Sequence, residues 1–296
     1  MMPDSNPSPG RKFRTALADA PLIVPGVFNA LVAKMAQQAG FRAAYQSGAA
    51  LSAGLAALPD IGLITQTEFA RQGQYLAQAV DIPIISDADT GFGPALSVER
   101  TVHEFEAAGL AGLHLEDQQM PKRCGHLSGK TLVDRAEMVG KLKAALRARH
   151  DGDFVIIART DARATEGLDA AIDRARAYVD AGADMIFPEA LESADEFERF
   201  ARAVKVPLVA NMTEFGKSPL LSVRKLGEMG YAAVLFPVTL FRLAMHAVER
   251  GLAEIAQTGT QRHMRGVMLT RAQLYELLGY QDYEERDREY FGDDRQ

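Results

Sequence analysis

The chain has 296 residues, of which 47% are hydrophobic and 24% charged, and it carries a net charge of −6 and a single cysteine. This composition indicates a globular protein with a large core, excludes an internal disulfide, and offers no basic surface for nucleic acid. The first residues contain no apolar stretch typical of a secretory signal, and no apolar run reaches the length of a membrane span. We therefore expect a cytoplasmic protein without nucleic-acid or membrane partners, whose residues 1–12 form a flexible tail.

Four segments along the chain share one plan, in which a helix ends at a glycine and a short apolar run follows. The glycines are Gly40, Gly109, Gly182 and Gly230. Glycine suits the left-handed conformation that ends many helices, and the apolar run after it predicts a buried strand. With four further apolar runs, the sequence predicts eight strands that begin near residues 22, 43, 82, 111, 154, 183, 206 and 232. Helical periodicity marks most stretches between them, including residues 98–108, 136–149 and 168–181.

Strands that alternate with helices predict a parallel sheet, and eight such units predict a (β/α)8 TIM barrel over residues 13–250. A doubly wound sheet is the alternative, but no G-x-G-x-x-G turn follows the first predicted strand. Residues 240–257 are expected to form a helix. Residues 251–296 are expected to form a C-terminal helical extension that packs on the barrel or exchanges with a neighbouring subunit.

Polar residues follow seven consecutive predicted strands. They include Tyr45, Asp87, Asp89, Glu116, Arg159, Glu189 and Asn211. A single acidic residue at a strand end is often a helix N-cap. A series of polar ends instead predicts an active site, because barrel enzymes place their catalytic groups at the C-terminal ends of the strands.

Asp87 and Asp89 are two residues apart, so their side chains would share a face in a regular strand. Such oxygen ligands suit Mg²⁺ or Mn²⁺. The alternative is that one aspartate caps the next helix while the other pairs with Arg159. Arg159 and Arg242 are predicted either to bind substrate carboxylates or to neutralise Glu189 and Asp87. Both roles fit a polycarboxylate site.

The only cysteine, Cys124, lies in the stretch MPKRCGHLSGK after the fourth predicted strand. The glycines Gly125 and Gly129 favour a mobile lid. Its cationic neighbours, Lys122 and His126 among them, favour a thiolate, so we expect a lowered pKa for this thiol. A lone cysteine can be an inert core residue, but the polar loop at the catalytic end of the barrel favours a functional one.

The KRCGH segment resembles the K-[KR]-C-G-H signature of the isocitrate lyase/phosphoenolpyruvate mutase superfamily, and in particular its 2-methylisocitrate lyase branch. The segments SGAALSAGLAALPDIGLIT, DADTGFG, GLHLEDQ, ARTDA, FPEA, NMTEFG and TRAQLYE match as well, so the resemblance runs from about Phe13 to Tyr283. It implies a barrel whose eighth helix is exchanged between subunits, in a homotetramer of swapped dimers.

The resemblance also implies a reaction, the Mg²⁺-dependent cleavage of (2R,3S)-2-methylisocitrate to pyruvate and succinate in the methylcitrate cycle of propionate catabolism. Mn²⁺ could replace Mg²⁺. Removal of the C2 hydroxyl proton breaks the C2–C3 bond and leaves a carbanion, which Cys124 would protonate as general acid. Arg159 would stabilise the developing charge, and the base would be Tyr45 or a water on the metal.

The same resemblance implies roles for many residues. Substrate would be held by Ser47, Gly48, Ala49, Cys124, Gly125, His126, Arg159, Glu189, Asn211, Thr213, Arg242 and Arg271. Asp87 and Asp89 would bind the metal directly or through water, and Asp60 and Glu116 would act through water. Ala49 departs from the Ser-Gly-Gly of many relatives, although its backbone N–H could still contact substrate.

Three alternatives compete with this function. Isocitrate lyases are longer and differ at FPEA and NMTEFG, and Phe187 favours a pocket that admits the extra methyl group. 2,3-Dimethylmalate lyases share nearly the same motifs, whereas phosphonopyruvate-processing members and oxaloacetate hydrolases generally lack the loop cysteine. A non-catalytic carboxylate-binding barrel belongs to a different class, and it would not be expected to keep Asp87, Asp89, Arg159 and Cys124 together.

Overall fold

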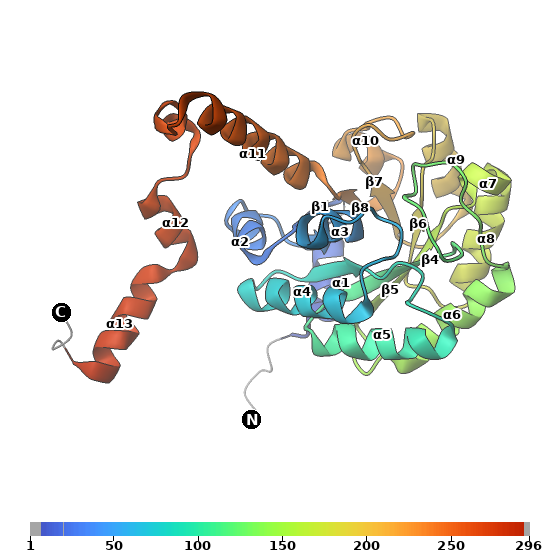
Figure 1. The fold of residues 1–296 in the computed structure, drawn as a ribbon. Helices are drawn as coiled ribbons and strands as arrows, with labels where there is room; N and C mark the ends of the chain where they lie inside the picture. Colours follow the sequence, from blue (N-terminus) through green and yellow to red (C-terminus); the bar gives the residue numbers. More distant parts are fainter. Residues whose placement is uncertain (1–6, 20, 293–296) are drawn as a thin grey trace. The chain divides into compact units, whose positions relative to one another are not determined.

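The computed structural model describes residues 7–19 and 21–292, and the chain divides into two compact units, Met1–Phe241 and Arg242–Gln296. The first unit contains eight parallel strands that alternate with helices (Figure 1). The strands are β1 Leu22–Pro25, β2 Ala44–Gln46, β3 Ile84–Asp87, β4 Gly112–Glu116, β5 Val155–Thr160, β6 Met185–Pro188, β7 Leu208–Asn211 and β8 Tyr231–Phe236. Most are buried throughout, as expected for a parallel sheet covered on both faces.

Sequence neighbours pair around the sheet from β2 to β8, and β8 pairs with β1. Between β1 and β2 the ring is closed by one bridge, Gly26 to Tyr45, next to which the Val27 N–H donates to the Tyr45 carbonyl at 2.8 Å. The result is a nearly closed eight-stranded barrel. The predicted barrel is confirmed, and each strand begins within two residues of its predicted start.

The helices of the first unit surround the strands (Figure 1). They are α1 Pro9–Leu17, α2 Ala30–Gln38, α3 Gly48–Ala56, α4 Gln66–Ala79, α5 Ala95–Ala107, α6 Arg135–Ala148, α7 Arg163–Glu166, α8 Leu168–Asp180, α9 Ala194–Ala203 and α10 Val223–Glu228. The four glycines expected at helix ends have positive φ angles, from 84° at Gly109 to 105° at Gly182. These glycines therefore end the helices as predicted.

Helix α1 differs from the expected tail over residues 1–12. Ser8 caps this helix by accepting a hydrogen bond from the Arg11 N–H at 3.2 Å, and Pro9 occupies the first turn. Phe13 is fully buried and joins the core inside the barrel. Residues 1–6 of the expected tail lie outside the described residues.

Alternate residues of the strands divide between two cores. On β5, Val155 and Ile157 face the barrel interior, whereas Ile156 and Ala158 pack against the helices. The interior is thus filled by side chains. A binding site must therefore lie at an end of the barrel.

The second unit is helical. Helix α11, Thr239–Thr258, begins in the first unit, and it is followed by the 3₁₀ helix Arg262–Val267, α12 Arg271–Leu278 and α13 Tyr280–Phe291. The unit boundary falls before the predicted residue 251, inside the continuous helix α11. Within the residues that the structure describes, every helix is too short or too polar to cross a membrane.

Candidate active site

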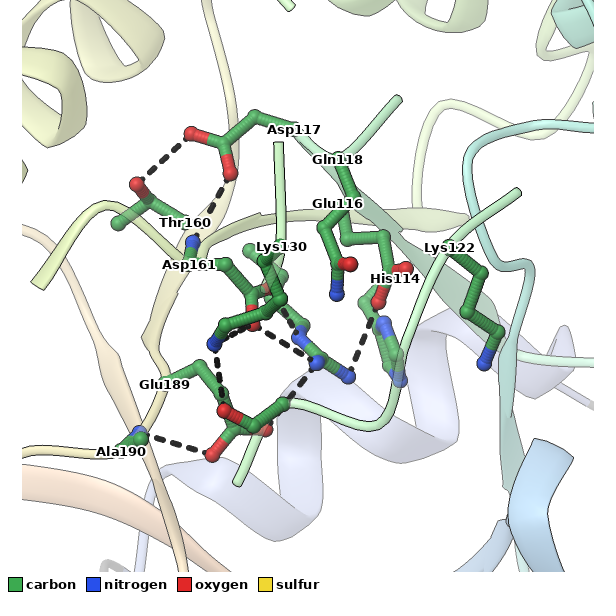
Figure 2. Close-up of polar contacts among 12 residues, drawn as sticks. His114, Glu116, Asp117, Gln118, Lys122, Lys130, Thr160, Asp161, Glu189 and Ala190 are labelled. Atoms are coloured by element: carbon green, nitrogen blue, oxygen red, sulfur yellow. Dashed lines mark hydrogen bonds and ion pairs between the residues drawn. The ribbon is translucent and has the colours of Figure 1, made fainter. Parts of the chain in front are cut away.

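The register of the parallel strands brings the polar strand ends together. Asp87 on β3 lies beside His114 on β4, and Glu116 on β4 lies beside Arg159 on β5. Because these residues are the last of their strands or close to it, they meet at the C-terminal end of the barrel. This is the end at which the sequence predicts an active site. Figure 2 shows His114 and Glu116 of this group.

Arg159 is the centre of this cluster. Its Nε lies 2.9 Å from Asp161 Oδ2, its Nη1 3.1 Å from Glu116 Oε2, and its Nη2 3.4 Å from Glu189 Oε2. The guanidinium also lies over the Phe187 ring, 5.3 Å from its centroid. Arg159 therefore pairs with Glu189, as predicted. Its other two partners are Glu116 and Asp161, whereas the predicted partner was Asp87.

Glu189 links three segments of the site. Its side chain accepts hydrogen bonds from the Ala190 N–H at 2.8 Å and from Asn211 Nδ2 at 3.2 Å, and His126 Nε2 lies 3.0 Å from Oε1. Burial alone would raise the pKa of Glu189, but Arg159 and His126 lower it below its ordinary range. Glu189 is thus held as a carboxylate.

The geometry of Asp87 and Asp89 differs from the expected strand. Strand β3 ends at Asp87, and Asp89 has a positive φ of 44°, so the two residues do not share a strand face. They are nevertheless joined, because the Asp89 N–H donates to Asp87 Oδ1 at 2.9 Å. Asp87 also accepts a hydrogen bond from the Gly48 N–H at 3.2 Å, and a side chain on Gly48 would come within 2.6 Å of Asp87 Oδ2.

Lys122 is a site residue that the sequence analysis treated only as a neighbour of the thiol. Its buried ammonium pairs with Asp60 and with Asp89, the latter at 2.7 Å. Burial raises the pKa of Asp89 to about 7, although Lys122 opposes the shift. The signal for Lys122 was its place in the KRCGH motif.

The site fits a hydrated divalent cation. Its carboxylates, Asp60, Asp87, Asp89, Glu116, Asp161 and Glu189, outnumber its cations, Lys122, Lys130 and Arg159. Buried Glu116 Oε1 has no hydrogen-bond partner among the described residues. Within the same residues, no three His, Cys, Asp or Glu side chains are arranged to hold an ion directly. Mg²⁺ keeps several waters and needs few direct carboxylates, so this donor set suits it.

Tyr45 and His114 form a buried pair below these carboxylates. The Tyr45 hydroxyl lies 2.8 Å from His114 Nε2, and His114 Nδ1 has no hydrogen-bond partner among the described residues. Burial lowers the pKa of His114 to about 4 and raises that of Tyr45 well above its ordinary value. A neutral imidazole therefore faces a protonated phenol, so Nε2 can accept the hydrogen bond. His114, at a polar strand end, is a site residue beyond those that the family resemblance implies.

The loop of residues 119–131 carries Cys124 over this cluster. At its neck, Gln118 bonds through its side-chain amide to both the N–H and the carbonyl of Arg123. A side chain on Gly125 would lie 2.4 Å from Glu189 Cγ and 2.5 Å from Arg159 Nη2. The loop backbone thus rests directly on the Arg159–Glu189 pair.

The expected lowering of the Cys124 pKa is wrong. Burial raises the pKa of this thiol, and Asp60 and Glu189 raise it further. The His126 backbone N–H and Arg159 lower the pKa of the thiol, but burial outweighs them, and Lys122 pairs instead with Asp60 and Asp89. At neutral pH the thiol therefore carries its proton.

The remaining predicted residues occupy several segments. Ser47 is the N-cap of α3, where it accepts the Ala50 N–H at 3.4 Å, and Ala49 is half-buried in the first turn of that helix. Thr213 is buried after β7. Arg242 and Arg271 belong to the second unit, at the starts of α11 and α12, and their roles stay predictions.

Comparison with known proteins agrees with this geometry. The phosphoenolpyruvate phosphomutase family model matches residues 13–256. The 2-methylisocitrate lyase of Aeropyrum pernix is 52% identical over 95% of this chain and 91% of its own length. The 2-methylisocitrate lyase of Salmonella typhimurium is 46% identical over 94% of this chain and 95% of its own length.

Solved structures agree on the fold. A crystal structure of 2,3-dimethylmalate lyase is 33% identical with a TM-score of 0.90, and covers 97% of this chain and 96% of that one. Phosphonopyruvate hydrolase in complex with oxalate and Mg²⁺ is 34% identical with a TM-score of 0.85, over 96% of this chain and 99% of that one. The chain therefore belongs to the 2-methylisocitrate lyases of the phosphoenolpyruvate mutase/isocitrate lyase superfamily.

Proposed function

We propose that this protein cleaves (2R,3S)-2-methylisocitrate to pyruvate and succinate. The observation that carries the proposal is the Cys124 loop, whose Gly125 rests on the buried Arg159–Glu189 pair. This arrangement puts one thiol beside a cation at the carboxylate-rich end of the barrel. The similar proteins support the substrate, because the 2-methylisocitrate lyase of Aeropyrum pernix is 52% identical whereas a 2,3-dimethylmalate lyase of known structure is 33% identical.

The substrate assignment is tested by comparing kcat/KM for 2-methylisocitrate, isocitrate and 2,3-dimethylmalate in the presence of Mg²⁺, with the 2-oxo acid product as readout. We expect 2-methylisocitrate to be preferred over isocitrate by about tenfold or more, since one methyl group in an apolar pocket is worth roughly 1–3 kcal/mol. If either competitor is cleaved as efficiently, the assignment is wrong.

The reaction begins at the C2 hydroxyl. Ser47, Gly48 and Ala49 bind the pyruvate-forming end of the substrate, and the N-terminus of α3 favours its carboxylate. The base for the hydroxyl proton would be Tyr45 or a water on the metal; the Tyr45 hydroxyl is held 2.8 Å from His114 Nε2, and its raised pKa makes its oxygen a strong base once it has lost its own proton. As the C2–C3 bond breaks, its electron pair moves to C3, and Arg159 stabilises the negative charge.

The second half of the reaction is protonation of C3. The Cys124 thiol donates its proton to the carbanion, so that pyruvate and succinate leave with all atoms of the substrate. A raised pKa suits this role, because the donor must enter the step protonated. The further substrate contacts that we propose are His126, Asn211, Thr213, Arg242 and Arg271.

Replacement of Cys124 by serine tests the acid. Cys124→Ser should bind substrate with an unchanged Kd but lose about 10²–10⁴ in kcat, as expected for loss of a general acid. The matched control is Ser128→Ala, a change at an exposed position of the same loop. A near-normal kcat in Cys124→Ser would remove the thiol from the proton-donating role.

The proposed cofactor is Mg²⁺, which Mn²⁺ could replace. Asp87 and Asp89 would hold it directly or through water, and Asp60 and Glu116 would do so through water. When bound, the cation polarises the C2 oxygen and its carboxylate. The superfamily relative with bound Mg²⁺ and oxalate, phosphonopyruvate hydrolase, supports this choice.

Asp87→Ala tests the metal site. The variant should need about tenfold or more Mg²⁺ for half-maximal activity, because it removes one of few carboxylate ligands. Asp180→Ala, at an exposed position at the end of α8, serves as control. An unchanged Mg²⁺ dependence of Asp87→Ala would contradict the ligand assignment.

We further propose a homotetramer of dimers that exchange α11. Helix α11 has no buried residue within the described chain, yet it exposes Val248, Leu252 and Ile255 at spacings of four and three residues. These positions form one apolar stripe, which a neighbouring subunit would cover.

Sedimentation velocity tests this assembly. The parent protein should sediment with four times the mass of one chain, and Leu252→Glu should shift it to smaller species because a charge then enters the buried stripe. Glu249→Gln, on the polar side of α11, should leave the mass unchanged. A monomeric parent protein would refute the tetramer.

A further inference from the structure

Lys130 is a buried cation at the far end of the Cys124 loop. Its side chain is 1% exposed, and its ammonium donates hydrogen bonds to the Gly125 carbonyl and, at 2.7 Å, to Asp161 Oδ1. Figure 2 shows the Lys130 side chain reaching Asp161 from the loop. The reaction as proposed above gives Lys130 no part.

Asp161 is shared between the loop and Arg159. Its Oδ1 accepts hydrogen bonds from Lys130 and from Arg159 Nη2, and its Oδ2 accepts one from Arg159 Nε at 2.9 Å. One fully buried carboxylate thus contacts both cations. Such charge-assisted hydrogen bonds are stronger and more directional than neutral ones.

Asp161 is itself fixed by a buried network at the end of β5. Its backbone N–H donates to Asp117 Oδ1 at 2.9 Å, and Asp117 Oδ2 accepts the hydroxyls of Thr160 and Tyr178, each at 2.8 Å. The position of Asp161 is therefore set by the barrel and not by the loop. A loop held to Asp161 is held to the barrel.

The Lys130–Gly125 bond spans the turn that carries the thiol. Cys124 precedes Gly125, and the Leu127 N–H closes a turn on the Cys124 carbonyl at 2.9 Å. Gly125 in turn rests on Arg159 and Glu189, so any movement of the turn away from Lys130 would also uncover that pair.

We propose that Lys130 is a positioning residue that latches the Cys124 turn closed and, through the shared Asp161, aligns it with Arg159. The proposal rests on the proposed function in one respect, that the closed turn is the reactive one. Lys130 touches no reacting atom. It increases the fraction of time for which the Cys124 thiol and the Arg159 guanidinium hold their relative positions.

The test uses Cys124 as its own reporter, since it is the only cysteine of the chain. In Lys130→Met the aliphatic stem stays and the ammonium is lost, so the turn should open more often. We expect a thiol reagent to modify Cys124 about tenfold faster or more near neutral pH, because the closed loop covers the thiol in part and local opening exposes it further. Lys143→Met, at an exposed position on α6, should react at the parent rate.

Kinetics give the second readout. kcat of Lys130→Met should fall about tenfold or more with a smaller change in KM, since the loss lies in alignment. The Mg²⁺ concentration for half-maximal activity should stay unchanged, because Lys130 contacts neither Asp87 nor Asp89 among the described interactions. A parent-like modification rate in folded Lys130→Met would overturn the latch.

Asp161→Asn keeps the proposal testable if Lys130→Met fails to fold. The amide keeps the shape of the side chain but removes the charge, so modification of Cys124 should again be faster than in the parent, and a parent rate would overturn the latch. Modification of the thiol needs no turnover. A near-normal kcat in Cys124→Ser would contradict the acid role, whereas a parent-like modification rate in Lys130→Met would contradict the latch. The two failures are therefore distinguishable.

Discussion

The pairing of one buried guanidinium with three carboxylates is the constraint on which this site depends. Glu116 reaches Arg159 from β4, and Asp161 and Glu189 reach it from the positions directly after β5 and β6, so the charges are compensated only when the parallel register is correct. A buried charge without its partners is costly. Correct strand pairing in the barrel and charge compensation in the site therefore depend on each other. The loop that carries Cys124 packs on the ion pairs that result.

The same distribution of charge affects the protonation state of the Cys124 thiol. Lys122 lies two residues from Cys124 in the chain, but its ammonium pairs with Asp60 and Asp89, and burial of the thiol outweighs the influence of Arg159 and the His126 N–H on its pKa. A thiolate would be a nucleophile, whereas a thiol that keeps its proton is an acid. A Cys124 thiol that keeps its proton is what the proposed acid role requires.

The barrel could be predicted because its signals are local. Glycines at helix ends and apolar runs after them report backbone conformation and burial directly, as Gly109 and β4 do. Helix α1 was missed because Ser8 and Pro9, which start a helix, also occur in loose tails. The site was harder, since Lys130 and Asp161 are 31 residues apart and only the folded barrel brings them together. The strand geometry assumed for Asp89 failed because the chain turns there with positive φ.

The junction between β1 and β2, where the ring of strands closes, lies at the active site. Seven neighbouring strand pairs are hydrogen-bonded within the sheet, whereas β1 and β2 are joined outside the paired strands, by the bridge from Gly26 to Tyr45. Segments held by few backbone hydrogen bonds open at lower free energy than the rest of a fold. We therefore expect the ring to open locally between β1 and β2 at a lower free energy than across its longer ladders, next to the strand that carries the Tyr45 hydroxyl.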